Sequence, residues 1–363
     1  MLIILSACTV LTLLATALPL SKHPHWIVRA MDFPRLQILV FTTALLIAII
    51  FFLDERMVLT LLLISLTALC LIWHLWWILP YTPLWPTEVK SSNGIKPERR
   101  LSIITANVLA SNRNAEALIN LVNKHQPDIL VTLESDQWWQ EQLKVLELDM
   151  PFTVKCPLDN LYGMHLFSKL PLHDQEISFL VEKGVPSIHA SIELRNGDRV
   201  RAHFVHPAPP SPTENTESAE RDAELIIVAR SVDKSNQPVI VTGDLNDVAW
   251  SSTTRLFRKI SALLDPRIGR GMFNTFHVKY PLLRWPLDHL FHSDHFTLNS
   301  IQRLPSIGSD HFPLFTTLSL TPAVGANQKG IEVESEDYER ANEIADEKNV
   351  SSEDVPIPNE KGN

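Results

Sequence analysis

The sequence predicts a mixed α/β domain that follows a group of membrane-spanning helices. Three observations support this prediction. Long apolar stretches without charge occupy the first 79 residues. Between residues 101 and 320, short apolar runs typical of buried strands alternate with helical patterns. The charge also changes along the chain, from a slightly basic first part to a strongly acidic end.

The first 79 residues predict about three transmembrane helices, near 1–20, 36–53 and 57–79. The second stretch has 18 uncharged residues and the third has 23, and each is long enough to cross a hydrocarbon core of roughly 30 Å. The first stretch has no basic residue before it and a poor cleavage site, which favours a span over a signal peptide. Trp73, Trp76, Trp77 and Tyr81 form an expected interfacial belt.

The basic residues around these spans predict their orientation. With three spans, Lys22, Arg29 and Arg35 face the same side as everything after residue 79, and the opposite side holds only Arg56. The positive-inside rule then places the C-terminal domain in the cytoplasm. If the first stretch were cleaved or lay flat on the membrane, the orientation would reverse. The chain is therefore expected to be an integral membrane protein in contact with the bilayer.

The remaining boundaries follow from composition. Residues 80–100 are rich in Pro and Ser and predict a linker. Residues 101–320 carry 20 Lys and Arg against 25 Asp and Glu, and they are numerous enough for a substantial core. Residues 321–363 are acidic, with few large apolar side chains, and predict a disordered tail. The three cysteines form no CxxC or Cys/His cluster, which argues against a zinc site or a disulfide framework.

The predicted strands of the domain end in polar residues. The run "DILVTLES" ends at Glu134, and "PVIVTGDLND" ends at Asp244 and Asn246. Continuous apolar runs of this kind indicate strands buried on both faces, and open sheets with helices build sites at the strand ends. If these ends converge, one site gathers the following side chains: Asn107, Glu134, His206, Asp244, Asn246, Asp310 and His311.

That set of carboxylates, carboxamides and imidazoles favours a hard divalent cation and a phosphate ester. Mg²⁺ prefers a few carboxylates, waters and phosphate oxygens. A carboxylate can activate water, and His⁺ and Asn can donate to the developing oxyanion. Each motif alone has an ordinary alternative: "GDLN" is a plausible strand-to-turn signal, and "HPAPP" a plausible extended linker. The ordered conjunction of five motifs at strand ends carries the prediction.

In this order the motifs resemble the endonuclease/exonuclease/phosphatase superfamily, which includes deoxyribonuclease I, inositol polyphosphate 5-phosphatases and neutral sphingomyelinases. The resemblance covers residues 101–320 and implies a four-layered α/β sandwich with two central β-sheets. It does not extend to the spans or the tail, although membrane-anchored bacterial members of similar layout are known. Together with the predicted spans, the resemblance implies a bacterial inner-membrane enzyme. The cation that it implies is Mg²⁺ or Mn²⁺.

The resemblance also implies roles for individual residues. The metal would be held at Asn107, Glu134 and Asp310, and the catalytic residues would be His206, Asp244, Asn246, Asp288 and His311. Asp244 would activate water, Asn246 would hold the phosphate, and the Asp288 of "PLDHLF" would orient His311. Gly243 is expected to let the backbone approach the substrate closely. Many members have Gln before the Glu, where this chain has Leu133.

The sequence leaves the substrate open. Four arginines that follow "GDLN" could line a groove for a phosphate backbone: Arg255, Arg258, Arg267 and Arg270. On that basis a nucleic acid is slightly favoured over a phospholipid, of the sphingomyelin or phosphoinositide type, that the membrane anchor would also suit. A second class of function is a catalytically silent membrane scaffold. The presence of every catalytic-type residue argues against it, and nothing in the sequence indicates a protein partner.

Overall fold

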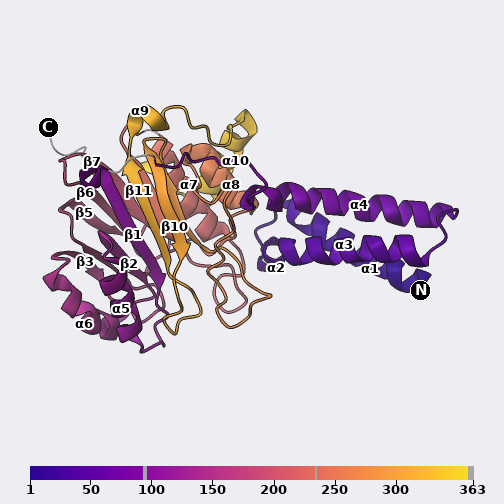
Figure 1. Ribbon diagram of the computed structural model, residues 1–363, viewed down its shortest axis with the longest axis horizontal. Helices are drawn as coiled ribbons and strands as arrows, with labels where there is room; N and C mark the ends of the chain where they lie inside the picture. Colours follow the sequence, from indigo (N-terminus) through magenta and orange to yellow (C-terminus); the bar gives the residue numbers. More distant parts are fainter. Residues whose placement is uncertain (93–95, 234, 359–363) are drawn as a thin grey trace.

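A rod of apolar helices is joined to an α/β domain in this computed structural model, which describes residues 1–92, 96–233 and 235–358 (Figure 1). The rod contains α1 (Leu2–Ala17), α3 (Arg35–Phe52) and α4 (Val58–Ile78), with the short helix α2 (Trp26–Ala30) between α1 and α3. Among the described residues, three helices are long and apolar enough to cross a membrane: Leu2–Ser21, Arg35–Phe52 and Val58–Tyr81.

Hydroxyl groups and a histidine face the interior of this helical rod. The Thr16 hydroxyl lies 3.0 Å from Nε2 of His74, which joins α1 to α4. The hydroxyls of Thr9 and Thr67 lie 3.4 Å apart on the same two helices. In a bilayer, small and polar residues of this kind allow close helix packing and bond between helices, whereas apolar side chains face lipid. The exposed apolar surface of the rod fits a lipid environment.

The strands form two sheets in the described part of the chain. The six-stranded sheet has the order β10-β11-β1-β2-β4-β3, and the five-stranded sheet has the order β5-β6-β7-β8-β9. The strands are β1 (Arg100–Asn107), β2 (Ile129–Leu133), β3 (Phe152–Cys156), β4 (Met164–Ser168), β5 (Leu172–Ser178), β6 (Ser187–Glu193), β7 (Arg199–Phe204), β8 (Val239–Asp244), β9 (Asp288–His292), β10 (Phe296–Arg303) and β11 (Leu314–Leu320).

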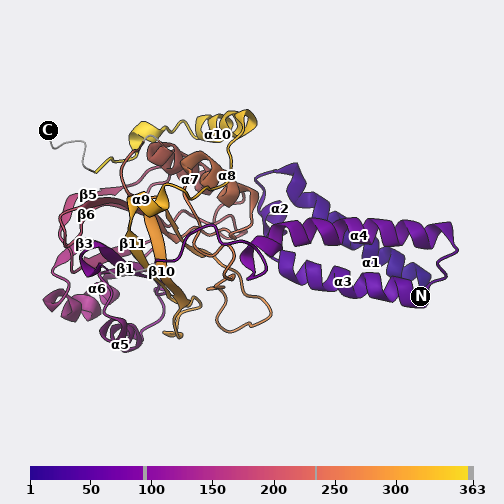
Figure 2. The ribbon, with the colours of Figure 1, turned by 45° about the horizontal axis from the view of Figure 1, so that its top comes forward.

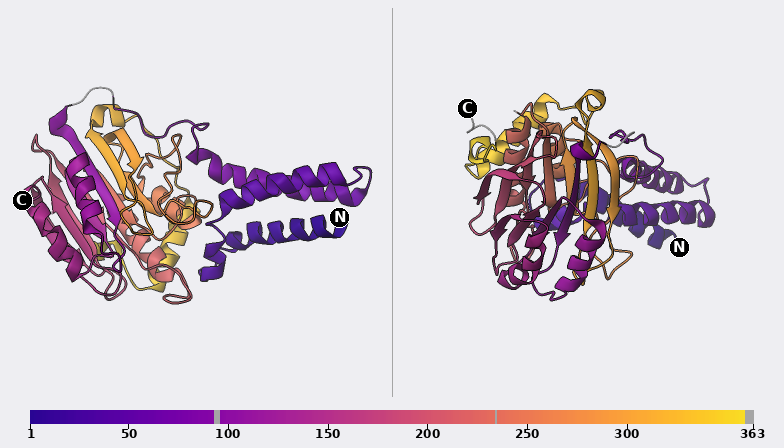
Figure 3. Two further views of the ribbon diagram at one scale, coloured as in Figure 1. Left: turned by 60° about the horizontal axis from the view of Figure 1, so that its bottom comes forward. Right: turned by 60° about the vertical axis from the view of Figure 1, so that its left-hand side comes forward.

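Helices cover the outer face of each sheet, so that the domain has four layers (Figure 3). Alternate residues of one strand face opposite sides. Ile103 of β1 packs between the sheets, whereas its neighbour Ile104 packs under α5 and α6. The expected α/β sandwich with two central sheets is confirmed. The covering helices are α5 (Ala115–His125), α6 (Gln137–Leu143), α7 (Ala219–Asp233) and α8 (Ser252–Ser261), and the 3₁₀ turns are Leu18–Ser21, Leu79–Tyr81, Pro97–Arg99, Lys144–Leu148 and Ser352–Asp354.

The segment after β11 forms helices where the sequence predicts disorder. Helices α9 (Pro322–Gly325) and α10 (Ser335–Glu347) follow β11, and α10 lies along α7 and α8 (Figure 2). Ala341 and Ala345 are one helical turn apart and buried against these helices. Asp337 pairs with Lys259 of α8 at 2.7 Å. Small apolar contacts and ion pairs order an acidic segment whose composition alone indicates a tail. Residues 359–363 of that predicted tail lie outside the described residues.

The predicted linker is also packed rather than free. Val89 is fully buried in the core between the sheets. Glu88 accepts hydrogen bonds of 2.6 Å from the guanidinium of Arg258 in α8. The Gly269 nitrogen donates to the carbonyl oxygen of Pro80 at 2.8 Å. These contacts hold residues 80–92 against the domain, while residues 93–95 of the predicted linker lie outside the described residues.

The Glu88–Arg258 pair provides a test of this packing. The Arg258 side chain is 1% exposed and that of Glu88 is 10% exposed. Because Arg258→Ala would leave a carboxylate buried without its partner, we expect it to lower the free energy of unfolding by about 3–5 kcal/mol. Arg99→Ala, which removes an exposed pair with Asp198, should cost less than about 1 kcal/mol. Urea unfolding of the full-length protein in detergent micelles measures both, and equal losses would contradict the packed linker.

Candidate functional site

The ends of five strands from both sheets meet at one edge of the sandwich. Parallel neighbours β1 and β2 end at Asn107 and Leu133, so that Glu134 follows directly beside Asn107. In the other sheet, Asp244 at the end of β8 lies opposite Asp288 at the start of β9. β11 runs antiparallel to β1, which brings the segment just before it to the same edge. The predicted convergence of strand ends is therefore what the topology produces.

Asn107 joins the carboxylates of the two sheets. Its Nδ2 donates to Oε1 of Glu134 at 2.7 Å and to Oδ2 of Asp244 at 3.2 Å. Its Oδ1 accepts the backbone N–H of Leu109 at 3.1 Å. In this geometry Asn107 presents its amide nitrogen to the site, whereas the sequence predicts it as a metal ligand. Asn107 therefore holds two carboxylates in place, and its role as a metal ligand stays a prediction.

His311 lies between two aspartates. Its Nδ1 is 2.8 Å from Oδ2 of Asp288, and its Nε2 is 3.5 Å from Oδ2 of Asp244. Burial by itself would lower the pKa of His311, but the Asp288 and Asp244 charges outweigh it and raise the pKa to about 10. Asp288 sits where it can fix the orientation of the ring, and the imidazolium directs its other N–H toward Asp244 and the pocket.

The loop after β8 is shaped by its own hydrogen bonds. The backbone N–H of Asn246 donates to Oδ1 of Asp244 at 2.9 Å. The side-chain Nδ2 of Asn246 donates to the carbonyl oxygen of Pro207 at 3.0 Å. A Cβ at Gly243 would meet the Val205 carbonyl oxygen at 1.8 Å. Glycine is required here because β8 approaches the backbone after β7, and this contact accounts for Gly243 without a substrate.

His206 lies behind this loop, 2% exposed. Burial lowers its pKa to about 4, despite the favourable charge of Asp244. Its ring centroid is 5.3 Å from that of Tyr162. His206 is therefore a neutral imidazole beside Asp244. Burial alone would raise the pKa of Asp244, but the His311 charge and hydrogen bonds from the Asn246 backbone and the Asn107 side chain outweigh it and hold the pKa of that carboxyl below its ordinary value.

The carboxylates of this site fit a divalent cation. Burial raises the pKa of Glu134 to about 7, and the charges of Asp310 and Asp244 add to the effect. A cation beside Glu134 would remove this cost, and carboxylate oxygens are the donors that Mg²⁺ prefers. Ligand atoms of Asp244, Asp288 and His311 also lie within 4.8 Å of one another. Because Asp288 and His311 already share a hydrogen bond, we interpret that trio as a proton-handling group and Glu134 with Asp310 as the ligands.

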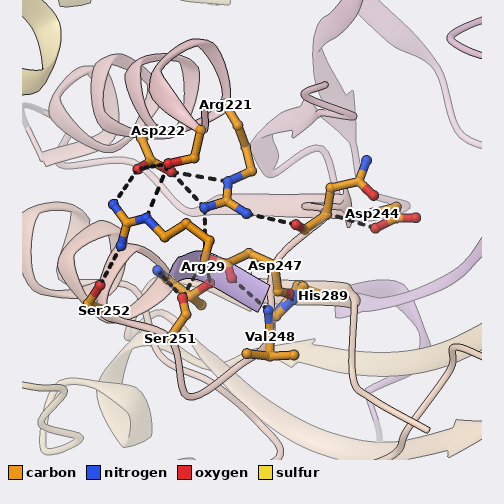
Figure 4. Close-up of polar contacts among 12 residues, drawn as sticks. Arg29, Arg221, Asp222, Asp244, Asp247, Val248, Ser251, Ser252 and His289 are labelled. Carbon is orange, nitrogen blue, oxygen red and sulfur yellow. Dashed lines mark hydrogen bonds and ion pairs between the residues drawn. The ribbon is translucent and has the colours of Figure 1, made fainter. Parts of the chain in front are cut away.

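A buried ionic network contacts the loop after β8, and the sequence does not reveal it (Figure 4). Arg221 of α7 donates to the Asn246 carbonyl oxygen at 2.8 Å and pairs with Asp222 at 2.8 Å. Asp222 also pairs with Arg29, at 2.9 Å, from the segment between α1 and α3. These three side chains are at most 6% exposed. The adjacent opposite charges of Arg221 and Asp222 in α7 are the signal in the sequence that could have indicated such a network.

The four arginines predicted to bind substrate have other partners within the fold. Arg258 pairs with Glu88, and Arg267 pairs with Asp265 at 2.8 Å, both 1% exposed. Arg270 donates to the Val89 carbonyl oxygen at 2.5 Å. Arg255 lies over the ring of Trp77, 4.8 Å from its centroid, at the end of the helical rod. The prediction of an arginine-lined groove is wrong, because buried carboxylates, a backbone carbonyl oxygen and an aromatic ring already contact these four side chains inside the fold.

The aspartate pair around His311 predicts a pH dependence of stability. The folded pKa of about 10 lies above the ordinary value of 6.5. Protonation of His311 therefore stabilises the fold fully below pH 6.5, and this contribution is lost as the pH rises through 10. We expect the difference in unfolding free energy between wild type and Asp288→Asn to shrink over this interval. Urea unfolding in micelles with a chelator measures it, with Asp198→Asn, an exposed site, as control. A difference that stays constant would contradict the pairing.

Comparisons with known proteins place this geometry in a family. The profile of the Endonuclease/Exonuclease/phosphatase family matches residues 104–311. The human Nocturnin catalytic domain with bound sulfate is 18% identical with a TM-score of 0.50, covering 61% of this chain and 94% of that chain. The endonuclease/exonuclease/phosphatase from Beutenbergia cavernae is 16% identical with a TM-score of 0.50, covering 61% and 72%. At these identities the likeness shows the fold alone.

A third solved structure, D. rerio TDP2 complexed with single strand DNA product, is 16% identical with a TM-score of 0.48 and covers 61% of this chain and 99% of that one. No curated protein matches the chain. The profile match spans more than half of the sequence and includes the segment from β1 to His311 in which the site residues lie. The chain belongs to the Endonuclease/Exonuclease/phosphatase family.

Proposed function

We propose that this protein is a membrane-anchored, divalent-metal-dependent phosphodiesterase, with residues 101–320 as its catalytic domain. The observation that carries the proposal is the meeting of Glu134, Asp244 and the Asp288–His311 pair at one edge of two sheets. Among the described residues that line the pocket at this edge, there is no serine or cysteine to act as a nucleophile. Water activated in place is the nucleophile that this set of side chains suits.

Each polar group has a place in such a hydrolysis. Asp244 stays ionised and can accept a proton from the attacking water. The His311 imidazolium, oriented by Asp288, can donate to the phosphoryl oxygens as negative charge develops there. Asn246 lines the same pocket and supplies a further hydrogen-bonding group, while the neutral His206 is buried near Asp244. The products are a phosphomonoester and an alcohol, whose oxygen takes up a proton when the P–O bond breaks.

The cation in this proposal is Mg²⁺ or Mn²⁺, held at Glu134 and Asp310. When bound, it would neutralise phosphate charge and polarise the phosphoryl oxygen. Asn107 contributes by holding Glu134 and Asp244 through its amide nitrogen. Ser309 donates to Oδ1 of Asp310 at 3.3 Å and so helps to orient the second carboxylate. The burial of Glu134, which raises the pKa of its carboxyl to about 7 and is costly without a cation, supports this assignment.

Substitution of the proposed site should remove hydrolysis without unfolding the protein. We expect Asp244→Asn and His311→Gln to lower the hydrolysis of bis(p-nitrophenyl) phosphate by about a hundred-fold or more, because each removes a proton-transfer or charge-stabilising group. Glu134→Gln should raise the Mg²⁺ concentration needed for half-maximal rate. Asp198→Asn, on the exposed surface, serves as the matched control.

The assay uses the full-length protein in detergent with Mg²⁺, Mn²⁺ or EDTA, and melting temperatures confirm that each variant is folded. Activity that survives both Asp244→Asn and His311→Gln would refute the assigned residues. If the folded wild type hydrolysed none of DNA, RNA, phospholipid or the soluble diester, the scaffold alternative would replace the enzyme.

We propose a cytoplasmic domain at a bacterial inner membrane. The segment with Lys22, Arg29 and Arg35 lies at the end of the rod that joins the domain, whereas the α3–α4 turn with Arg56 lies at the other end (Figure 1). A C-terminal green fluorescent protein fusion should therefore fluoresce in cells, and a C-terminal alkaline phosphatase fusion should be inactive. The reverse pattern would place the domain on the outer side.

A further inference from the structure

The pocket at the site has a polar floor and an apolar wall. It has a volume of about 640 Å³, within the usual range for binding sites of small molecules. Its floor contains Glu134, Asn246, Asp310 and His311. Its wall is formed mainly by apolar side chains from two separate segments, one between α1 and α3 and one between α8 and β9: Trp26, Phe33, Phe276, Leu283, Trp285 and Leu287. A ligand that fills this pocket therefore has a phosphate-like end and an apolar body.

The membrane region itself supplies part of this wall. Trp26 and Phe33 belong to the segment between α1 and α3, and Pro34, the residue just before α3, also lines the pocket. This segment is bound to the domain by the backbone N–H of Trp26, which donates to the Thr216 carbonyl oxygen at 3.0 Å. Phe33 packs edge-on against Trp285, with ring centroids 5.6 Å apart. The pocket is therefore adjacent to the point where a candidate span begins.

An exposed apolar loop lies beside the first turn of α3, next to the pocket. Leu282 is 85% exposed, Tyr280 56% and Leu283 47%. The Leu282 carbonyl oxygen accepts a hydrogen bond of 2.7 Å from Gln37, in the first turn of α3. The segment between α8 and β9 that carries this loop extends toward the helical rod in Figures 1 and 2. Apolar and aromatic side chains held beside the first turn of a span would be buried in the bilayer interface.

From this arrangement we propose that the substrate is a membrane glycerophospholipid, whose phosphodiester reaches the floor of the pocket from the bilayer surface. The apolar wall would hold the glycerol and the first part of the acyl chains, and the loop around Leu282 would keep the pocket mouth in contact with lipid. This inference rests on the proposed phosphodiesterase function and adds its substrate class. Water adds to phosphorus, one P–O bond to an alcohol breaks, and the leaving oxygen takes a proton.

The same surface is unsuited to a nucleic-acid backbone. Such a backbone requires several free basic side chains along a groove. Arg29, the arginine that lines the pocket, is paired with Asp222. The pocket also contains the carboxylates of Glu134, Glu214 and Asp310, which repel a polyanion unless a cation is present. An apolar wall offers such a chain no phosphate contacts.

The test compares lipid and soluble substrates in one preparation of full-length protein. The protein is reconstituted into vesicles of phosphatidylethanolamine and phosphatidylglycerol with Mg²⁺, and the lipid products are followed by mass spectrometry. Bis(p-nitrophenyl) phosphate and a single-stranded oligodeoxynucleotide are assayed alongside. We expect vesicle phospholipid to be hydrolysed at least about ten-fold faster than the oligonucleotide, since only the lipid buries an apolar body.

A matched pair of variants tests the role of the wall and loop. Leu283→Asp places a charge at the pocket mouth and should lower the ratio of lipid to soluble-diester hydrolysis by about ten-fold. Leu148→Asp changes an equally apolar residue that is 88% exposed near α6, at the far end of the domain, and should leave the ratio unchanged.

The outcomes separate the two proposals. Hydrolysis of the soluble diester without hydrolysis of vesicle lipid would overturn the lipid inference and leave the phosphodiesterase proposal intact. Faster cleavage of the oligonucleotide than of lipid would overturn it in favour of a nucleic acid. Failure to hydrolyse any of the three would refute the proposed function itself. An equal effect of Leu283→Asp and Leu148→Asp would remove the assigned role of the pocket mouth.

Discussion

The buried ionic network of Arg29, Asp222 and Arg221 is the interaction on which the arrangement of this protein depends. It joins the segment between two spans to α7 and, through the Asn246 carbonyl oxygen, to the loop that holds Asp244. Removing one member of such a network leaves the others buried without partners, which typically costs several kcal/mol. The position of the loop after β8 is thereby coupled to the helical rod as well as to the sheet.

Further contacts extend the same connection. The Trp250 indole donates to the Asp32 carbonyl oxygen at 2.8 Å, and the Tyr81 hydroxyl donates to the Ala249 carbonyl oxygen at 2.6 Å. Val248, Ala249 and Trp250 form one apolar cluster with residues of the rod and of the pocket wall. Residues 248–250, just after "GDLN", are therefore packed against the apolar helical rod. In this protein the rod is a structural part of the candidate site.

The charges of the site follow from this enclosure. His311 and the aspartates around it sit in a buried pocket where unpaired charge is costly, so that each carboxylate is matched by an imidazole, an amide or the proposed cation site. Burial lowers the pKa of both histidines, but only at His311 do neighbouring carboxylates outweigh it, so that the pKa of His311 is raised and that of His206 is lowered. His311 has a hydrogen-bonded carboxylate as its partner, and the Nδ1 of His206 has none among the described residues.

The sequence by itself determined the three long apolar helices, the α/β class and the order of the candidate site residues, because these depend on local patterns: apolar length, strand-like runs and the residue that ends each strand. Tertiary structure decided what the charged residues do. The sequence around Arg258 and Arg267 predicts a basic surface, yet Glu88 and Asp265 form ion pairs with them inside the fold. The composition of the acidic tail predicts disorder, yet Ala341 and Ala345 pack against apolar side chains of α7. The apolar wall is likewise assembled from segments far apart in the chain, since partners distant in sequence meet only after folding.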